Sequence, residues 1–326
     1  MFAVVLVGGV GTRLRPLTLT TPKPLLPLGQ RTILESLLAQ LARGGVTDAV
    51  LALGFKPEPF LRMFPTNVCA GVRLHYAIED SPLDTAGAIG FAARSVGLHE
   101  RSATFVVANG DIVTDLSIAA LIVQHRKCVR NGGAATLHLT PVADPTQFGV
   151  VEFEGSGAIA DSARKVTGFV EKPTAGSTTS NFVNAGTYVF ETSVLELLPG
   201  DAPLSVERVT FPELVRRGAL FALPTDDYWL DAGRPDTYRL ANLHLITGAR
   251  AEQDDAVHES ARIDAHAQVV NSVVGAQATI ARGARVVDSV IFPGAHIGAD
   301  ANVVESCVMG EVAPGAAILG SLVGRD

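Results

Sequence analysis

The C-terminal part of the chain, about seventy residues, repeats every six residues, and this pattern limits the possible fold more than any other feature. Aliphatic residues recur six apart with one five-residue step per round, so that successive rounds begin at Val257, Val274, Ile291 and Val308. Alanine stands two places before most of these aliphatic positions. A period of six predicts a triangular coil of short strands with aliphatic side chains inside and small residues at the corners. An ordinary antiparallel sheet would show a period of two.

Upstream, to about residue 245, strand-like and helix-like segments alternate. This rhythm predicts an α/β fold with a mostly parallel sheet and helices on both of its faces. We therefore expect two domains, a catalytic domain over 1–245 and a hexapeptide-repeat domain over 255–326. Thr32 and Glu35 form a capping box that opens the first expected helix. The expected strands cover 2–7, 49–53, 72–78 and 104–108, and the expected helices cover 32–41, 85–93 and 117–127.

The middle of the chain, 134–190, is richer in strand-like segments. We expect an antiparallel insert there that covers the mouth of the parallel sheet. Three further helices, near 194–198, 206–217 and 236–246, should complete the first domain.

Composition and charge exclude several classes of protein. The net charge of −7 disfavours nucleic acid as a partner. No apolar run is long enough to cross a bilayer and no signal peptide precedes the first strand, so we expect a cytoplasmic protein without a membrane partner. The three cysteines are too few and too far apart for a disulfide framework or a metal site.

A glycine-rich loop follows the first expected strand. Gly8, Gly9 and Gly11 would let backbone N–H groups approach phosphate oxygens, with Thr12 beside them and Arg13 adding a charged fork. Leu14 stands where a dinucleotide fingerprint needs glycine, and no Gly-Lys-Ser/Thr sequence forms a Walker A loop. An NAD-dependent oxidoreductase is therefore disfavoured. Three glycines alone would also suit a tight strand-to-helix turn, so the residues that follow decide between the two.

Two of only five lysines stand in proline-flanked motifs. Lys23 lies between Pro22 and Pro24, and Lys172 lies between Glu171 and Pro173. Such rigid settings favour a functional role over a solubilising one, although Glu171 and Lys172 could also be a solvated pair at a strand end.

The stretch GGVGTRLRPLTLTTPKPLLPL resembles the signature of the sugar-1-phosphate nucleotidylyltransferases, and among them it is most similar to the mannose-1-phosphate guanylyltransferases. The FVEKP, NAGTYVF and WLDAG segments and the hexapeptide coil follow in the family's order. The resemblance implies a Rossmann-like catalytic domain followed by a left-handed β-helix. It also implies an enzyme that joins a sugar 1-phosphate to a nucleoside triphosphate and releases pyrophosphate.

This reaction brings two polyanions together and needs no protein nucleophile, so we expect cationic side chains and Mg²⁺. Asp111, at a strand end, and Asp231, in WLDAG, are the expected metal ligands, although either could instead cap a helix or turn. Arg13 would bind the β- and γ-phosphates, Lys23 the α-phosphate, and Lys172 the phosphate of the sugar.

The resemblance also assigns residues to the sugar and the base. Glu171, Asn184 and Gly149 would line the sugar, and Gly110, Pro82 and Thr85 would bind the nucleotide. Glu79 could accept two hydrogen bonds from guanine. Asp84 departs from the family pattern, which has glycine at this position.

GTP and mannose 1-phosphate are the substrates favoured by the resemblance. The alternatives are a thymidylyl-, uridylyl- or adenylyl-transferase acting on a glucose-type or other cyclic 1-phosphate, and a non-catalytic subunit that senses nucleotide sugars. A non-catalytic subunit should have lost some of the charged site residues, and this chain retains Arg13, Lys23, Asp111, Lys172 and Asp231. The coil predicts a homo-oligomer.

Overall fold

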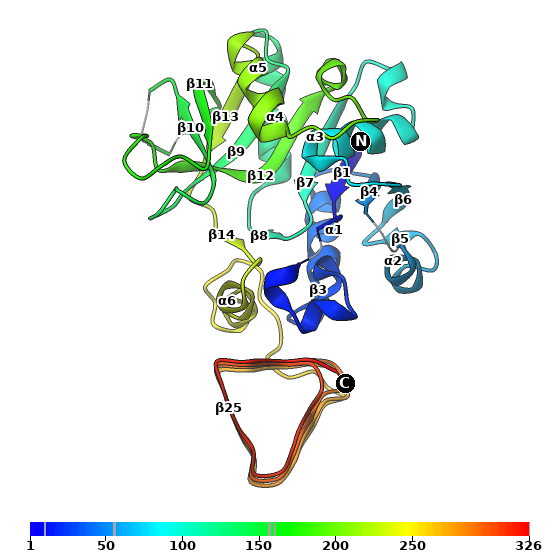
Figure 1. The fold of residues 1–326 in the computed structure, drawn as a ribbon, viewed down its shortest axis with the longest axis vertical. Coiled ribbons are helices and arrows are strands. Elements are labelled where there is room, and N and C mark those ends of the chain that lie inside the picture. The colour runs from blue at the N-terminus through cyan, green and yellow to red at the C-terminus, as the bar shows by residue number, and fades with distance from the viewer. Residues whose placement is uncertain (10, 55–56, 156–157, 160, 326) are drawn as a thin grey trace. The chain divides into compact units, whose positions relative to one another are not determined.

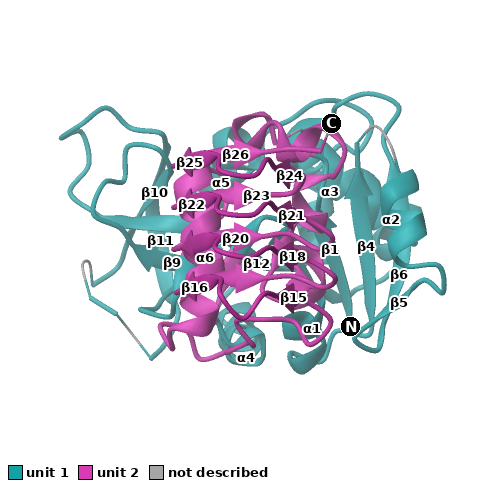
Figure 2. Cartoon of the chain, turned by 90° about the horizontal axis from the view of Figure 1, so that it is seen from below, with its two compact units in different colours: residues 1–8, 37–112, 116–229 teal, residues 9–36, 113–115, 230–326 magenta. Residues whose placement is uncertain are grey.

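A computed structural model describes residues 1–9, 11–54, 57–155, 158–159 and 161–325. Val10 of the glycine-rich loop and Asp326, the last residue of the predicted coil domain, lie outside the described residues. The chain divides into two compact units (Figure 2). Unit 1 comprises Met1–Gly8, Leu37–Ile112 and Leu116–Trp229, and unit 2 comprises Gly9–Ser36, Val113–Asp115 and Leu230–Asp326. The glycine-rich loop from Gly9 onward thus belongs to the same unit as the coil, and the domain boundaries expected from the sequence stay a prediction.

Unit 1 is built on a ten-stranded sheet with the order β10-β11-β13-β9-β12-β7-β1-β4-β6-β5 (Figure 1). The strands β6, β4, β1 and β7 run parallel, as the alternating sequence predicts. The apolar runs of β1, β4 and β7 are largely buried, as is usual for parallel strands that helices cover on both faces. The strands are β1 (Phe2–Leu6), β4 (Asp48–Leu53), β5 (Val68–Cys69), β6 (Val72–Ile78), β7 (Thr104–Asn109), β9 (Ala135–Pro141), β10 (Gly149–Phe153), β11 (Arg164–Glu171), β12 (Phe182–Glu191) and β13 (Leu220–Pro224).

The middle of the chain forms antiparallel pairs, as expected, but its strands are part of the main sheet. Strand β12 pairs antiparallel with β7 on one side and with β9 on the other, so Tyr188 lies opposite both Val107 and Leu137. This strand is apolar on both faces, and nearly all of its residues are buried. Such a strand is suited to the interior of a sheet. The segment therefore extends the main sheet with antiparallel pairs.

The main helices agree with the sequence expectations. The capping box is confirmed, because the Thr32 N–H donates to Glu35 Oε2 at 2.7 Å and the Glu35 N–H donates to Thr32 Oγ1 at 3.1 Å. The expected helix near 194–198 is a 3₁₀ helix, η5 (Thr192–Leu197). The α-helices are α1 (Ile33–Arg43), α2 (Glu58–Met63), α3 (Asp84–Ser95), α4 (Ile118–Val129), α5 (Phe211–Arg216) and α6 (Pro235–Ile246), and the other 3₁₀ helices are η1 (Thr12–Leu14), η2 (Leu17–Leu19), η3 (Lys23–Leu25) and η4 (Leu98–Glu100). None of the helices in the described ranges is long and apolar enough to pass through a membrane.

The expected helix over 206–217 is divided in two. It begins as a π-helix, η6 (Val206–Thr210), and continues as α5. Pro212 stands in the first turn of α5. Because proline has no N–H to donate, the regular α-helical ladder cannot run unbroken through this position.

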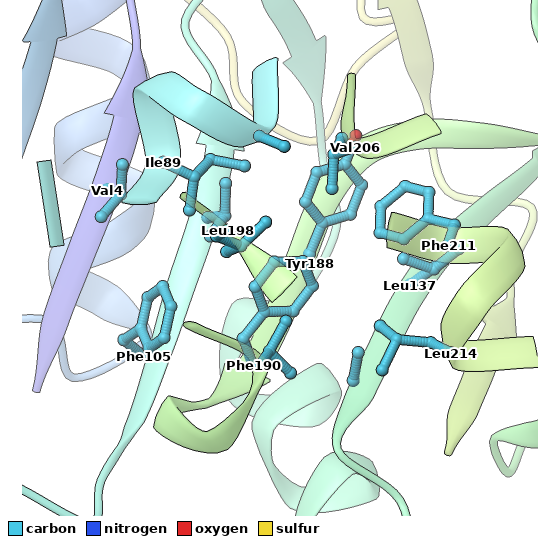
Figure 3. Close-up of a cluster of buried hydrophobic side chains, with 14 of the residues drawn as sticks. Val4, Ile89, Phe105, Leu137, Tyr188, Phe190, Leu198, Val206, Phe211 and Leu214 are labelled. Carbon is cyan, nitrogen blue, oxygen red and sulfur yellow. The ribbon is translucent and has the colours of Figure 1, made fainter. Parts of the chain in front are cut away.

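An aromatic cluster forms the centre of the unit 1 core (Figure 3). The rings of Tyr188 and Phe190 stack with centroids 5.6 Å apart, and Phe105 packs edge-on against Phe190 at 5.8 Å. Phe211 of α5 packs edge-on against Tyr188 at 5.2 Å. Aromatic pairs in these geometries add stability beyond the area they bury. The first turn of α5 is therefore anchored on β12.

In unit 2 the hexapeptide coil is confirmed. Its short strands form three parallel sheets, with the orders β15-β18-β21-β24, β16-β19-β22-β25 and β17-β20-β23-β26, and Figure 1 shows the coil end-on as a triangle. The inward aliphatic residues of the regular rounds, such as Ile280, Val286 and Ile291, are buried. The strands are β15 (Arg262–Ile263), β16 (Gln268–Val270), β17 (Val273–Val274), β18 (Thr279–Ile280), β19 (Arg285–Val287), β20 (Val290–Ile291), β21 (His296–Ile297), β22 (Asn302–Val304), β23 (Cys307–Val308), β24 (Glu311–Val312), β25 (Ala317–Leu319) and β26 (Leu322–Val323).

Helix α6 packs on this coil inside unit 2. Arg239 donates from Nη1 to the Asp288 carbonyl oxygen at 2.8 Å, and the rings of Tyr238 and Phe292 lie 6.1 Å apart. The Gly29 N–H of the segment that follows the glycine-rich loop donates to Asn242 Oδ1 of α6 at 2.9 Å. The helix thus connects the loop segment to the coil. The remaining short strands are β2 (Pro27–Leu28), β3 (Arg31–Thr32), β8 (Ile112–Thr114) and β14 (Trp229–Asp231).

Candidate active site

The glycine-rich loop leads into a short 3₁₀ turn in unit 2. Gly11 adopts a left-handed conformation with φ of 62°, and its carbonyl oxygen accepts a hydrogen bond from Thr18 Oγ1 at 2.8 Å. Thr12 and Arg13 begin the η1 turn, and both are exposed. The Arg13 guanidinium is therefore accessible to a polyanion. Gly8 and Gly9, directly after β1, are exposed as well.

Lys23 and Asp231 meet in unit 2, although they come from opposite ends of the chain. Lys23 Nζ lies 3.6 Å from Asp231 Oδ1, and the Lys23 side chain is only 8% exposed against 36% for Asp231. Gly233 allows the pair to form, because a Cβ atom there would lie 2.8 Å from Asp231 Oδ1 and 3.1 Å from Lys23 Nζ. This accounts for the glycine of the WLDAG motif. The sequence assigns the two residues separate roles and does not predict their contact.

Gly110 and Asp111 follow β7 in unit 1. The Gly110 N–H donates to the Leu6 carbonyl oxygen at 2.8 Å, which holds this turn against the end of β1. Asp111 is half-buried directly after it. The acid thus stands at the carboxyl end of a parallel strand, the edge of such sheets where ligands bind.

The predicted base-binding segment links β6 to α3. Glu79 is half-buried, and its Oε2 accepts from the Leu83 N–H at 3.1 Å. Burial raises the pKa of the Glu79 carboxyl, and the bond from Leu83 opposes this change. Pro82 is exposed.

Asp84 opens α3 in a left-handed conformation, with φ of 55°, and its carboxylate accepts from the Thr85 N–H at 2.7 Å. Glycine adopts this conformation without strain, and aspartate is among the few other residues that tolerate it. The replacement of the family's glycine by Asp84 therefore fits the backbone of this turn.

The Thr85 hydroxyl is engaged inside the protein. It donates to Glu207 Oε2 at 2.7 Å and accepts from the Val206 N–H at 2.9 Å. Glu207 did not appear among the residues expected from the sequence. Its partner stands 122 positions earlier in the chain, so no local pattern could have indicated this contact.

The predicted sugar-binding residues lie on neighbouring strands of unit 1. Gly149 of β10 stands opposite Glu171 of β11, and a Cβ at Gly149 would lie 2.6 Å from the Phe169 ring and 3.0 Å from Glu171 Oε2. Only glycine leaves room for both groups. Lys172 Nζ lies 3.5 Å from Glu171 Oε1, so these two residues form an ion pair with the lysine exposed.

The environment of Glu171 disfavours its ionised form. Burial raises the pKa of the Glu171 carboxyl, and the negative charge of Glu207 raises it further. Lys172 and Arg208 act in the opposite direction.

Asn184 of β12 is held by two hydrogen bonds. Its Nδ2 donates to the Tyr188 hydroxyl at 2.9 Å, and its Oδ1 accepts from the Gly186 N–H at 3.1 Å. Trp229 donates from Nε1 to the Ala185 carbonyl oxygen at 2.9 Å. Tyr188 and Trp229 were not predicted as site residues. They lie in the NAGTYVF and WLDAG motifs, and these motifs could have indicated them.

The comparisons with known proteins agree with these motifs. The family profile described as nucleotidyl transferase matches residues 2–248, and a profile described as GlmU-like, C-terminal hexapeptide matches residues 247–321. The chain belongs to the nucleotidyl transferase family. The family resemblance inferred from the motifs is therefore confirmed.

Two curated relatives of this nucleotidyl transferase carry similar names. A mannose-1-phosphate guanylyltransferase of Mycobacterium tuberculosis is 35% identical over 293 residues, which cover 86% of this chain and 77% of that protein. A mannose-1-phosphate guanyltransferase of Debaryomyces hansenii is 35% identical over 248 residues, covering 76% of this chain and 65% of that protein. Among solved structures, UDP-glucose pyrophosphorylase from Acinetobacter baumannii has a TM-score of 0.62 at 21% identity, over 74% of this chain and 92% of that one. This last likeness supports the fold.

The carboxylates of this nucleotidyl transferase suit a hard cation. Among the residues that the structure describes, no group of three or more His, Cys, Asp or Glu side chains could hold a metal ion by itself. Mg²⁺ is commonly held by one or two carboxylates together with substrate phosphates and water, rather than by a closed protein cage. Asp111 and Asp231 match that donor type.

Proposed function

We propose that this nucleotidyl transferase joins a sugar 1-phosphate to a nucleoside triphosphate and releases pyrophosphate, with mannose 1-phosphate and GTP as its substrates. The contact of Lys23 with Asp231 carries the proposal. It brings together a cation from the signature motif and a carboxylate from the WLDAG motif, the two kinds of charge that a reaction between polyanions requires. The names of the curated relatives support the choice of substrates.

In the proposed reaction an oxygen of the sugar phosphate attacks the α-phosphorus while pyrophosphate leaves in line. Catalysis of this kind depends on positioning and charge neutralisation. The exposed Arg13 would bind the β- and γ-phosphates and stabilise the leaving pyrophosphate. The buried Lys23 would bind the α-phosphate, where charge develops, and Lys172 would bind the phosphate of the sugar.

We further propose that Asp111 and Asp231 hold Mg²⁺, which when bound would neutralise phosphate charge. Lys23 orients the Asp231 carboxylate through their ion pair. Neighbouring glycines allow backbone N–H groups to approach phosphates, and this supports the assignment of Gly8, Gly9 and Gly11 to the nucleotide. The Gly110 N–H is bonded to the Leu6 carbonyl oxygen, so the assignment of Gly110 to the nucleotide rests on the family resemblance.

The sugar would be bound by the β10–β11–β12 part of the sheet. Glu171 would accept hydrogen bonds from ring hydroxyls, and Asn184 would lie against the sugar beside Gly149. Guanine would be recognised by Glu79, whose carboxylate can accept from both N1–H and N2–H₂. Thymidylyl, uridylyl or adenylyl transfer to another sugar 1-phosphate is the second candidate, because the solved relative acts on a different pair of substrates according to its name.

A pyrophosphate-release screen of the purified full-length protein against several nucleoside triphosphates and sugar 1-phosphates tests the proposal. We expect the highest kcat/KM for GTP with mannose 1-phosphate, and only with Mg²⁺ present. A preference for another pair would keep the class of reaction and change the specificity. Absence of turnover with every pair would instead favour a non-catalytic sensing subunit.

We also propose that the chain is a cytoplasmic homo-oligomer that associates through its β-helix. Hexapeptide coils stack repeated units, and such coils commonly serve as assembly elements. Light scattering on the full-length protein measures its mass directly. A mass equal to that of one 34.1 kDa chain would contradict the oligomer.

A further inference from the structure

Glu207 stands in an unusual turn of unit 1. It belongs to η6, a short π-helical turn that directly precedes α5. Ser205 caps this turn, since its Oγ accepts from the Arg208 N–H at 3.2 Å and donates to Glu207 Oε2 at 2.9 Å. π-Helical turns are rare and frequently occur at functional sites. The turn therefore holds the Glu207 carboxylate in a defined position.

The same turn is joined to the start of α3. Glu207 Oε2 also accepts from Thr85 Oγ1 at 2.7 Å, and the Val206 N–H donates back to that hydroxyl at 2.9 Å. The main chain reinforces the connection, because the Ala86 N–H donates to the Leu204 carbonyl oxygen at 2.7 Å. The predicted base-binding segment is thus attached to η6 by both side-chain and backbone bonds.

These bonds use the hydrogen-bonding capacity of Thr85. A threonine hydroxyl has one proton to donate and two lone pairs to accept with. The proton of Thr85 goes to Glu207, and one lone pair takes the Val206 N–H. Thr85 therefore has no proton left for a nucleotide, and the assignment of this hydroxyl to direct nucleotide binding loses its main chemical basis.

Strand β11, which ends at Glu171, contacts η6, so the charge of Glu207 also acts on the sugar-binding side of unit 1. Burial is the main cause of the raised pKa of Glu171, and the negative charge of Glu207 raises this pKa further. The same charge adds to the effect of burial on the pKa of Tyr188, the hydrogen-bond partner of Asn184. Lys172 on β11 and Arg208 on η6 are the cations that oppose the effect on Glu171. One carboxylate thus influences both predicted binding regions of unit 1.

We propose that Glu207 is a positioning residue for this reaction, which fixes the nucleotide-binding segment through Thr85 and sets the charge beside Glu171. This inference rests on the proposed function. It adds a residue that no sequence motif indicated, and it changes the role of Thr85 from a nucleotide ligand to a structural link.

A double-mutant cycle on the full-length protein tests the link. We expect Thr85→Val and Glu207→Leu each to lower kcat/KM by about ten- to a hundredfold, the effect of one lost hydrogen bond to a charged group. The kcat/KM of the double variant should be no lower than that of Glu207→Leu alone, because both substitutions remove the same contact between Thr85 and Glu207. Thr85→Ser keeps the hydroxyl and should retain activity. If the two losses in kcat/KM multiply in the double variant, Thr85 and Glu207 act independently. That result would overturn the link and favour direct binding of the nucleotide by Thr85.

The pH dependence of kcat/KM for the sugar 1-phosphate tests whether Glu207 sets the charge beside Glu171. The ionised Glu171 can accept from sugar hydroxyls through both of its oxygens, whereas protonation turns one oxygen into a donor. The value of kcat/KM for the sugar 1-phosphate should therefore fall on the acid side. Glu207→Gln removes a negative charge near Glu171 and lowers its pKa. The acid limb should therefore move to lower pH, an effect that loss of folding stability alone would not produce. An unmoved limb would overturn the electrostatic role.

Glu213→Gln on α5 is the matched control. The Glu213 carboxylate accepts from Arg216 and Arg217, which lie on or next to its own helix. It should leave kcat/KM and the acid limb unchanged. If Glu207→Leu fails to fold, Thr85→Val and Glu207→Gln still decide the matter, since both preserve side-chain shape. If the wild type is active and the Thr85 and Glu207 variants behave like Glu213→Gln, only this inference is overturned. If the wild type is inactive, the proposed function is overturned and this inference with it.

Discussion

The ammonium group of Lys23 lies 3.6 Å from the carboxylate of Asp231, and the lysine side chain is almost fully buried. A buried ammonium is costly unless an opposite charge lies beside it. Pro22 and Pro24 restrict the backbone on both sides of the lysine, and Gly233 leaves space for the pair. Lys23 of the PKP motif and Asp231 of the WLDAG motif therefore form one charged contact in unit 2.

The first prediction concerns Lys23. We expect Lys23→Met to lower kcat by about a hundredfold or more, the loss typical of removing one donor that stabilises charge in a transition state. The substitution keeps the length of the buried side chain, so packing should survive. Pyrophosphate release at saturating substrates measures the effect.

Lys127→Met is the control for this change. Lys127 is exposed on α4, and removing its charge should leave turnover unaltered. Equal kcat values for the two variants would mean that Lys23 serves only to balance Asp231.

The second prediction concerns the proposed metal ligands. Asp111→Asn and Asp231→Asn should each reduce kcat by orders of magnitude, because each residue acts on transition-state charge. Asp111→Asn should leave the folded state nearly intact, whereas Asp231→Asn also removes the counter-charge of the buried Lys23 and should lower the free energy of unfolding. Titration of activity with Mg²⁺ measures the effect. The exposed Asp226, changed to Asn, is the matched control. Near-normal turnover of both site variants at saturating Mg²⁺ would contradict the assignment.

Local patterns in the sequence predicted a large part of the fold. The capping box of Thr32 and Glu35 depends on residues three apart, and the inward positions of the coil depend on a fixed spacing, so a short window of sequence contains the information. The last round of the coil departs from that spacing. Ile297 pairs with Val312 there, which is two residues earlier than the regular repeat would place its partner.

Contacts between distant segments could not be predicted in this way. The apolar sequence of β12 does not indicate whether the strand joins the main sheet or a separate one, and its pairing with β7 decides this. The contact between Thr85 and Glu207 is of the same kind, because neither residue has a local pattern that specifies the other. Motifs identified Lys23 and Asp231 individually, and only the fold shows that they form a pair.

The third prediction concerns the stability of the coil. Buried serines form a ladder along one of its corners, in which Ser289 Oγ accepts from the Ser306 N–H at 3.1 Å and donates to the Val287 carbonyl oxygen at 2.7 Å. Ser289→Ala would leave both backbone groups without this partner. We expect the free energy of unfolding to fall by about 1–3 kcal/mol, measured by urea denaturation.

Ser321→Ala tests whether burial causes this loss. Ser321 ends the ladder and is only half-buried, and its bond to the Leu319 carbonyl oxygen is exposed, so water can replace its hydroxyl. Its substitution should cost much less than that of Ser289. Equal losses would show that the hydroxyls stabilise the coil by a local effect that does not depend on burial.

The last prediction is that Glu79 selects guanine. Its carboxylate is half-buried after β6, and one oxygen already accepts from the Leu83 N–H, which fixes its orientation. Glu79→Gln keeps the shape but turns one acceptor into a donor that would face a guanine donor. A bidentate contact to a base discriminates by roughly 1–3 kcal/mol in nucleic-acid recognition. On that scale, kcat/KM for GTP should fall by about ten- to a hundredfold relative to UTP or dTTP.

The pH dependence of this selectivity gives a second measurement. Burial raises the pKa of Glu79, and the carboxylate form is the one that accepts from guanine. As the pH falls through this raised pKa, kcat/KM for GTP should decrease more than kcat/KM for UTP, and Glu79→Gln should abolish the difference. Variants of Arg13 or Lys23 should slow every nucleotide alike, because these cations contact only phosphates in the proposed reaction. A Glu79→Gln enzyme that keeps its full preference for GTP would mean that other groups recognise the base, such as the backbone around Asp84.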